Sequence, residues 1–279
     1  MPQRKAETIT EELPFVSDMA YPEIEVKGRE DEIRNLTEVL YRRRMQNCVL
    51  VGPPGVGKTA IVREVARRLA DTYKFVSLDT GALEAGTDLR GTFENKILQL
   101  VAASRRYENN YNKKVVVFID EIHTICTAGA LRAKETELTA ANMLKPYISE
   151  GKLTVWGATT VPEYAMTIGR DKALMRRLPP VLVSELSKEN IIEILKKFSD
   201  GCSGVTDHLI ECVYSCSEEI SGINPDKSID ILDRAMAKKK LFGKFISWTD
   251  AVNAAKSDVK RSREAVEQVM LSGVTNNSL

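Results

Sequence analysis

The chain has 279 residues, a length that suits one large domain or two smaller ones. Hydrophobic residues make up 43% and charged residues 28%, values that are ordinary for a globular protein. The formal net charge is only +1, so no overall field draws the chain onto nucleic acid or a membrane, although its 40 Lys and Arg residues could gather on one face.

Cysteine usage and the first residues indicate a reduced, cytoplasmic protein without membrane contact. Five cysteines are an odd number for a disulfide framework. The N-terminal residues are polar and charged, unlike a secretory signal. No apolar run approaches the roughly 20 residues of a membrane-spanning helix. Cys202, His208, Cys212 and Cys216 lie near one another in the sequence, but their spacing matches no common zinc pattern.

Residues 1–22 carry three prolines, Pro2, Pro14 and Pro22, and no sustained hydrophobic period. Such a segment either is flexible or lies across a neighbouring molecule, and its composition favours a flexible N-terminal tail.

The next part of the chain alternates predicted strands with predicted helices. Strands are expected over residues 47–51, 75–79, 115–120, 153–158 and 181–183, and helices over 31–44, 58–71, 93–106 and 138–150. The strand over 115–120 is a near-continuous β-branched run, which is typical of a parallel sheet buried on both faces. The alternation predicts a doubly wound α/β domain, a three-layer α/β/α sandwich around a parallel sheet.

The pattern changes after Leu186, where only helices are expected. They cover about residues 188–199, 207–220, 226–241 and 249–270, the last with a break near Ser257. We therefore divide the chain into the tail 1–22, an α/β domain over 23–186, and a helical domain with a C-terminal tail over 187–279.

The strongest motif is Gly52-Pro-Pro-Gly-Val-Gly-Lys-Thr59, which fits the P-loop (Walker A) pattern. It lies between a predicted strand and a predicted helix, where glycines let backbone N–H groups turn toward phosphates and the helix N-terminus adds positive charge. Lys58 should reach the β- and γ-phosphates, and Thr59 should hold Mg²⁺. The residues expected against ATP in this segment are Pro54, Gly55, Val56, Gly57, Lys58, Thr59 and Ala60.

A second motif, Phe118-Ile-Asp-Glu121, ends the most hydrophobic strand. Asp120 should face the metal bound by Thr59, which makes Thr59 and Asp120 the candidate Mg²⁺ ligands. Glu121 follows where it can activate a water for attack on the γ-phosphate. The pair predicts hydrolysis as well as binding of ATP.

Two weaker signals follow in the sequence. Gly157-Ala-Thr-Thr160 places hydroxyls after another strand, where one of them could bond the attacking water or the γ-phosphate. The pair Arg176 and Arg177 is an ordinary surface feature when taken alone. In a nucleotide-driven ring, such a pair would reach the γ-phosphate of a neighbouring subunit and act as an arginine finger.

With these four features in order, the chain resembles the AAA+ superfamily, and within it the first ATPase module of the Clp-type disaggregases and unfoldases, here as a stand-alone single module. The resemblance implies a P-loop AAA+ domain with a helical lid, and an ATP-dependent ring, expected to be a homo-hexamer, with active sites between subunits. It makes Thr160 the sensor-one candidate, and Arg176 and Arg177 the arginine-finger candidates. It also implies that Val26 and Lys27, before Gly28-Arg-Glu30, hold the adenine, and that Pro225 and Asp226 belong to the lid motif Pro225-Asp-Lys-Ser-Ile-Asp230.

One stretch departs from that family. Its pore loop carries an aromatic residue before Arg-Gly, whereas this chain has Gly86-Thr-Asp-Leu-Arg-Gly91. Leu89 therefore stands in the aromatic place and Asp88 in a usually basic one. An aromatic ring grips a threaded polypeptide through its flat apolar area, so the substitution leaves the threading of polypeptides open.

Three functions follow as hypotheses. The first is an ATP-hydrolysing ring that remodels a protein or a protein complex. The second is an ATP-controlled assembly or loading factor for nucleic-acid machinery, for which residues 42–44 and 238–240 are candidate phosphate contacts that otherwise read as solvated helix faces. Nucleic acid is thus possible but not indicated, since no aromatic stripe for base stacking is present. The third is a nucleotide-dependent regulatory switch, which the intact Asp120-Glu121 pair disfavours.

Overall fold

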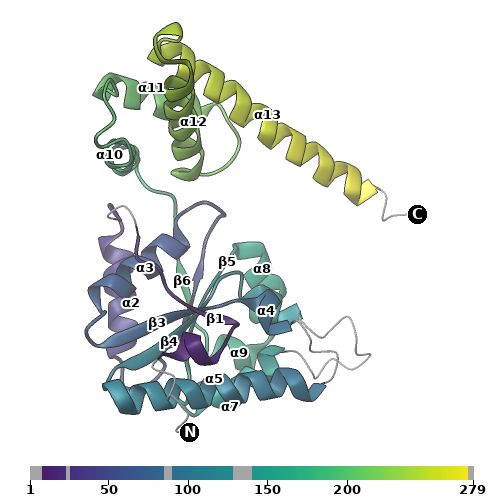
Figure 1. Cartoon of the computed structure of the whole chain (residues 1–279). Helices are drawn as coiled ribbons and strands as arrows, with labels where there is room; N and C mark the ends of the chain where they lie inside the picture. Colours follow the sequence, from purple (N-terminus) through teal and green to yellow (C-terminus); the bar gives the residue numbers. More distant parts are fainter. Residues whose placement is uncertain (1–7, 23–25, 85–89, 128–139, 276–279) are drawn as a thin grey trace, which may run out of the picture. The chain divides into compact units, whose positions relative to one another are not determined.

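The computed structural model describes residues 8–22, 26–84, 90–127 and 140–275 (Figure 1). The chain forms two compact units. The first, called the sheet unit here, consists of Met1–Glu23, Arg29–Gly52 and Lys58–Val183. The second, the helical unit, consists of Ile24–Gly28, Pro53–Gly57 and Ser184–Leu279.

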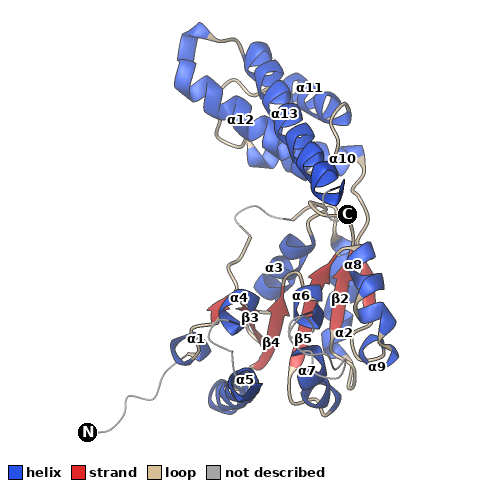
Figure 2. Cartoon of the chain, turned by 90° about the vertical axis from the view of Figure 1, so that its right-hand side faces the viewer, coloured by secondary structure: helices blue, strands red, loops and turns tan. Residues whose placement is uncertain are grey.

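A six-stranded sheet with the order β1-β3-β4-β5-β2-β6 organises the sheet unit (Figure 2). Its strands are β1 (Val16–Asp18), β2 (Cys48–Val51), β3 (Tyr73–Leu78), β4 (Lys114–Ile119), β5 (Thr154–Thr159) and β6 (Pro180–Leu182). Five of them, β2 to β6, run parallel to their neighbours, and β1 pairs antiparallel with β3 at one edge. The predicted α/β fold with a parallel sheet is confirmed, with one antiparallel strand added.

Burial on both faces of the sheet makes the three layers. Along β4, Val115, Val117 and Ile119 belong to the apolar cluster that also contains residues of α5 and α7. The intervening Val116 and Phe118 are equally buried, and because side chains alternate along a strand they point to the opposite face. The helices of this unit are α1 (Ile9–Glu12), α2 (Glu30–Tyr41), α3 (Lys58–Arg68), α4 (Thr80–Glu84), α5 (Arg90–Tyr111), α6 (His123–Thr127), α7 (Ala140–Ser149), α8 (Val161–Met166) and α9 (Lys172–Met175), with a 3₁₀ turn η1 (Ile168–Arg170).

The helical unit contains α10 (Lys188–Phe198), α11 (Asp207–Glu218), α12 (Asp226–Phe242) and α13 (Trp248–Thr275), with a 3₁₀ turn η2 (Gly243–Phe245) between the last two. They share one apolar core that includes Leu195, Val213 and Leu232. The expected break near Ser257 is wrong. The Ser257 hydroxyl donates to the carbonyl of Asn253 at 3.0 Å, so the polar side chain is satisfied within the helix.

The flexible tail expected over residues 1–22 is wrong for residues 9–18. Thr8 caps α1, and β1 continues the sheet by pairing with β3. Ile9, Leu13 and Phe15 are buried in the same apolar cluster as the sheet. These elements are four and three residues long, too short to show a hydrophobic period, and tertiary burial alone stabilises them.

Within the described residues, no helix has the length and apolar character needed to cross a bilayer.

The packing of the N-terminal segment is testable through Phe15, which is 3% exposed. Phe15→Ala should lower the free energy of unfolding of the sheet unit by about 3 kcal/mol or more, because it empties a buried aromatic site. Urea unfolding followed by Trp156 fluorescence, in a chain where the only other tryptophan is changed by Trp248→Phe, reports on this unit. Tyr21→Ala, at a residue 53% exposed, should change the free energy by less than about 0.5 kcal/mol. Equal stability of the two variants would instead support the prediction that this segment is flexible.

Candidate nucleotide site

The carboxyl ends of three neighbouring strands gather most of the predicted chemistry of the sheet unit. The strands β4, β5 and β2 are adjacent and parallel, so their carboxyl ends share one edge of the sheet. Asp120 and Glu121 follow β4, and Thr160 follows β5. Lys58 and Thr59 begin α3, which follows β2 through the glycine-rich loop. We call this the carboxyl edge.

Two glycines of the glycine-rich loop have a backbone conformation with positive φ. Gly55 and Gly57 have φ values of 76° and 98°, a region that side chains with a Cβ rarely adopt. A Cβ at Gly55 would lie 2.7 Å from the Cβ of Asp226, so these two parts of the helical unit approach closely. This approach brings the predicted lid residue Asp226 to the predicted phosphate loop.

Lys58 and Thr59 are held by contacts within the sheet unit. The Lys58 ammonium donates to the carbonyl of Gly52 at 2.9 Å. Burial lowers the pKa of Lys58 below its ordinary value, and the carboxylates of Glu121 and Asp120 oppose that shift. The Thr59 hydroxyl donates to Asp120 Oδ2 at 2.8 Å.

The Thr59–Asp120 pair fits the predicted magnesium site. A hydroxyl and a carboxylate are hard oxygen ligands, which Mg²⁺ prefers, and both oxygens already meet at one point of the carboxyl edge. These residues would hold the ion, which would neutralise phosphate charge.

Glu121 has an unusual backbone. Its φ is 49°, in the left-handed region that costs free energy for a residue other than glycine. The conformation turns the chain sharply after β4 and leaves the side chain 54% exposed. Partial desolvation of the carboxylate by the surrounding chain, followed by the like charge of Glu163, raises the pKa of Glu121 above its ordinary value. A carboxylate with a raised pKa is a stronger acceptor for a proton from water.

A polar network connects the ends of β4 and β5. His123 Nδ1 lies 3.3 Å from carboxylate oxygens of both Glu121 and Glu163, and 3.0 Å from the Thr159 hydroxyl. Thr160 caps α8, and its hydroxyl donates to Glu163 Oε2 at 2.7 Å in a capping box. Ligand atoms of Glu121, His123 and Glu163 all lie within 4.8 Å of one another.

Glu163 belongs to this network, although it was not among the residues predicted from the sequence. Burial would raise the pKa of Glu163, but the hydrogen bonds donated by Thr160, the nearby His123 and the Thr159 hydroxyl together lower it below its ordinary value. The spacing Thr160-Val-Pro-Glu163 is a capping-box signature that could have shown it. The predicted sensor residue Thr160 therefore uses its hydroxyl in a helix cap, while the fully buried Thr159 contacts His123.

The remaining predicted nucleotide contacts fall in two places. Ala60 lies in the first turn of α3. Pro54 and Val56 lie in the glycine-rich loop, in the part that belongs to the helical unit. Val26 and Lys27, which are half-buried, lie in a separate segment of the same unit. Pro225 precedes α12 and Asp226 begins it. Asp226 forms an ion pair with Arg263 of α13 at 2.9 Å. Arg263 carried no sequence signal, because it lies 37 residues from its partner.

Arg176 and Arg177 are not part of the carboxyl edge. They follow α9 and precede β6, at the amino end of a strand that runs parallel to β2. They therefore lie at the edge of the sheet opposite Lys58 and Glu121. Asp88 and Leu89, of the predicted pore-loop stretch, lie outside the described residues.

Comparisons with known proteins agree with this geometry. Residues 48–182 match the family model described as ATPase family associated with various cellular activities (AAA). The chain is similar to ATPases of the AAA family, and within that family to the ATPase modules of the Clp proteins. The chaperone protein ClpB of Aquifex aeolicus is 38% identical over 263 residues, which are 89% of this chain and 25% of that protein.

A second curated relative and a solved structure are also similar to this chain. The ATP-dependent Clp protease ATP-binding subunit ClpE of Bacillus subtilis is 38% identical over 258 residues, 87% of this chain and 36% of that protein. The structure of the Saccharomyces cerevisiae Hsp104–ADP complex superposes with a TM-score of 0.73 at 30% identity, over 88% of this chain and 44% of that one. The chain thus spans 25% of the length of ClpB and 36% of the length of ClpE.

The Thr59–Asp120 pair gives a prediction about metal-dependent binding. Thr59→Ala should weaken ATP binding by about tenfold or more in the presence of Mg²⁺, because one hard ligand is lost, and much less when EDTA removes the ion. Titration of a fluorescent ATP analogue under both conditions measures this. Thr37→Ala removes a hydroxyl that bonds only within α2, to the carbonyl of Ile33, and should leave both affinities unchanged. An equal loss with and without Mg²⁺ would contradict the assignment.

Proposed function

We propose that this chain binds Mg²⁺ and ATP, hydrolyses the γ-phosphate, and uses the energy as part of an oligomeric ring that remodels a protein or a protein complex. The observation that carries the proposal is the cluster at the carboxyl edge. A threonine–aspartate pair at 2.8 Å is followed directly by Glu121, a glutamate in a strained backbone conformation. In such an arrangement, one residue binds the metal and the next residue in the chain accepts the proton.

The side chains have distinct roles in this proposal. Lys58 binds the phosphates, and Thr59 and Asp120 hold Mg²⁺, which when bound neutralises developing phosphate charge. Glu121 accepts the proton of the attacking water. His123 orients Glu121 through its 3.3 Å contact and is itself fixed by Glu163.

Residues of the helical unit are further candidates for nucleotide binding. Val26 and Lys27 are proposed to hold the adenine, and Pro225 and Asp226 to close over the nucleotide as a lid motif. Support comes from the close approach of Gly55 to Asp226, which leaves no room for a side chain in the loop at that point.

The position of the predicted finger residues supports the proposed ring. Arg176 and Arg177 lie at the edge of the sheet opposite Glu121, so they can serve a nucleotide only on another copy of the chain. Repetition of such a head-to-tail contact closes into a ring, for which a hexamer is the expected size. Thr160 is proposed to sense the γ-phosphate from the end of β5.

The central prediction concerns Glu121. Glu121→Gln should retain binding of Mg²⁺ and ATP and lose at least about a hundredfold in turnover, because an amide accepts no proton at neutral pH. Phosphate release measured alongside nucleotide binding separates the two effects. Glu193→Gln, at an exposed glutamate of α10, is the matched control and should turn over normally. Normal hydrolysis by Glu121→Gln would remove Glu121 as the base.

Remodelling of proteins predicts stimulation by an unfolded polypeptide. ATP turnover should rise severalfold when unfolded casein is added and should not respond to a folded protein of similar size or to single-stranded DNA. A solved structure similar to this chain, titled as Hsp104 with ATPγS and FITC casein, makes casein a suitable probe. Stimulation by DNA alone, lost at high salt, would instead favour a loading factor for nucleic-acid machinery.

A further inference from the structure

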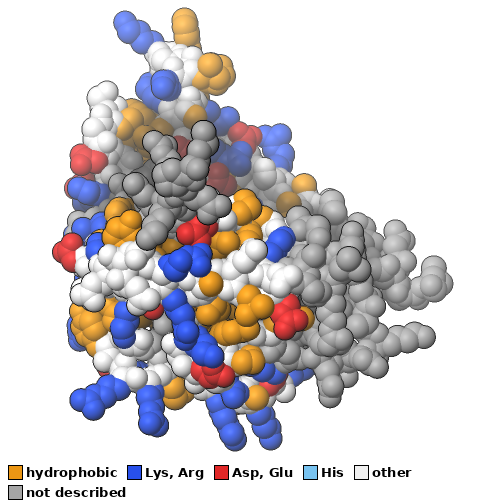
Figure 3. Space-filling view, turned by 60° about the horizontal axis from the view of Figure 1, so that its bottom comes forward, with side chains coloured by type: hydrophobic (Ala, Val, Ile, Leu, Met, Phe, Trp, Pro, Cys, Tyr) orange, Lys and Arg blue, Asp and Glu red, His pale blue; other side chains and the backbone are white. Residues whose placement is uncertain are grey.

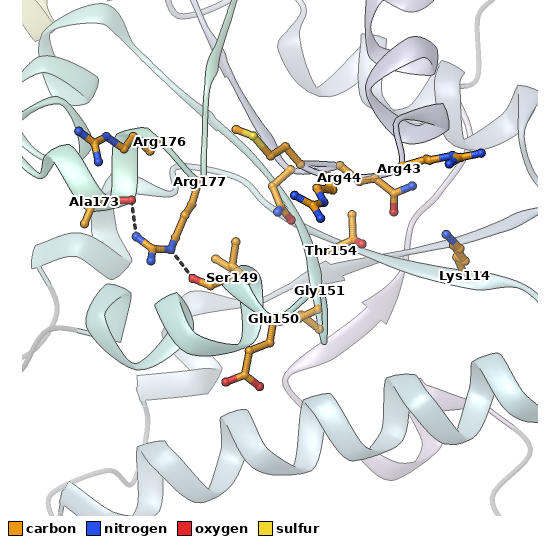
Figure 4. A pocket seen from close by; sticks show the side chains of 15 residues that line it. Arg43, Arg44, Lys114, Ser149, Glu150, Gly151, Thr154, Ala173, Arg176 and Arg177 are labelled. Carbon is orange, nitrogen blue, oxygen red and sulfur yellow. Dashed lines mark hydrogen bonds between the residues drawn. The ribbon is translucent and has the colours of Figure 1, made fainter.

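Cationic side chains of the described residues gather in a pocket and at a turn. The pocket, of about 850 Å³, lies in the sheet unit, and its lining includes Arg43, Arg44, Lys114, Arg176 and Arg177 (Figure 4). We call it the cationic pocket. It lies at the amino edge of the sheet, where the parallel strands begin, and Figure 3 shows projecting Lys and Arg side chains at that end. Because its lining contains Arg176 and Arg177, this pocket belongs to the contact between copies already proposed.

The turn lies between α12 and α13, at one end of the helical unit (Figure 1). Three of its apolar side chains project into solvent: Leu241 is 76% exposed, Phe242 48% and Phe245 98%. Phe245 is the most exposed large apolar side chain among the described residues. We call these three residues, together with Lys240 and Lys244, the apolar tip. Neighbouring apolar side chains that stay exposed mark a site of interaction.

The apolar residues of the tip continue α12 past the end of its core. Phe242 lies seven residues after Ala235, which places the two side chains on the same face of the helix. Ala235 is fully buried in the core of the helical unit, whereas Phe242 is not part of it. Leu241 and Phe245 are also outside that core. Folding of the helical unit therefore gains little from these three side chains.

Hydrogen bonds fix the turn that carries the tip. The Lys239 ammonium donates to the carbonyls of Gly243 at 2.9 Å and of Ile246 at 2.5 Å. Gly243 follows α12 with a φ of 55°, and its N–H donates to the carbonyl of Lys239. At the start of α13, the N–H of Asp250 donates to the Ser247 hydroxyl at 3.0 Å. A turn held at both ends presents its side chains with less entropy left to lose on binding.

The tip carries positive charge that the chain does not neutralise. Residues 234–249 contain five Lys and Arg residues and no Asp or Glu. Lys238 forms an ion pair with Asp258 at 2.7 Å. Among the described residues, Lys240 and Lys244 have neither a hydrogen bond nor an ion pair. Both are exposed, so their charge is available to an anionic partner.

We propose that the apolar tip docks on the surface of a lipid bilayer that contains anionic phospholipids. Leu241, Phe242 and Phe245 enter the headgroup region, and Lys240 and Lys244 meet the lipid phosphates. An anionic bilayer offers negative charge directly above an apolar layer, which complements cations that flank projecting apolar side chains. The inference goes beyond the proposed function and does not depend on it.

Nucleic acid and an acidic protein fit the tip less well. Lysines alone would serve the phosphates of a nucleic acid, and Leu241 has no flat ring on which a base could stack. An acidic protein would need a groove shaped to three projecting side chains, whereas a bilayer surface adapts to them. The expectation of no membrane contact rests on the net charge of the whole chain and on the lack of a long apolar run, and a short turn changes neither.

Sedimentation with vesicles tests the proposal in the whole chain. Vesicles of phosphatidylserine and phosphatidylcholine should bind the chain about tenfold more tightly than pure phosphatidylcholine, because the lysines contribute only at an anionic surface. Leu241→Ser with Phe245→Ser should weaken binding to the anionic vesicles by about tenfold or more, since the apolar side chains no longer enter the bilayer. Val266→Ser, at an exposed apolar residue of α13, is the matched control and should bind normally.

The charge of the tip is tested separately. Lys240→Glu with Lys244→Glu should reduce binding to the anionic vesicles by about tenfold or more, because attraction becomes repulsion. Lys260→Glu, at an exposed lysine of α13, should have a much smaller effect. Binding unchanged by the double charge reversal would overturn the proposal.

A fluorescent side chain at the tip reports on insertion directly. In a chain carrying Trp248→Phe, Phe245→Trp places an indole at the exposed apex, while the remaining Trp156 is buried in the sheet unit. Anionic vesicles should shift the emission of the new indole to shorter wavelength as the ring leaves water for the headgroup region. Val266→Trp should show no shift. Absence of a shift for Phe245→Trp under conditions where the chain sediments with the vesicles would overturn docking through the tip.

Other occupants of the tip give different results. Vesicle binding by the Leu241–Phe245 double variant equal to that of Val266→Ser, with melting curves showing that both are folded, would overturn the proposal. Lipid-free association that the double variant abolishes, without vesicle binding, would assign the tip to a second copy. Salt-sensitive binding to DNA or to polyglutamate, without vesicle binding, would assign it to nucleic acid or to an acidic protein. Each of these results would overturn the bilayer as the partner.

The proposed ATPase is tested independently in the same proteins. Leu241→Ser with Phe245→Ser changes no residue of the nucleotide site, so ATP turnover in the absence of vesicles should equal that of the unchanged chain. Vesicle binding without turnover would reject the proposed function alone, and turnover without vesicle binding would reject only the docking of the tip.

Discussion

The parallel pairing of β2, β5 and β4 is the constraint on which the chemistry of this protein depends. It collects the carboxyl ends of three strands at one edge, where Lys58, Thr59, Asp120 and Glu121 come together from segments about 60 residues apart, as the Thr59–Asp120 separation of 61 shows. The same pairing collects the amino ends at the other edge. One sheet therefore carries two surfaces of opposite chemical character.

The two edges of the sheet carry side chains of opposite charge. At the carboxyl edge, Glu121, Glu163 and His123 crowd within a few ångströms, and the pKa of Glu121 rises through burial and through its neighbour Glu163. At the amino edge, Arg43 and Arg176 face a pocket without a carboxylate partner among the described residues. One edge of the sheet thus carries an acidic cluster, and the other edge carries a cationic pocket.

Strain and local caps support the carboxyl edge. Glu121 has a φ of 49°, a conformation that is tolerated because buried β4 and the packed α6 fix the chain on both sides of it. Thr160 begins α8 through a capping box with Glu163, so the cap also holds the carboxylate beside His123. A residue that starts a helix thereby also holds Glu163 beside His123.

The sequence by itself determined the α/β fold, the glycine-rich loop and the Asp120–Glu121 pair, because each depends on a pattern of adjacent residues. Only the tertiary structure decided the burial of α1 and β1, the unbroken α13, the Asp226–Arg263 ion pair and the cationic pocket. Apart from α13, which is one continuous helix, these features join segments distant in the chain. Their stability comes from contacts between elements and not from local propensity, and so no local pattern records them.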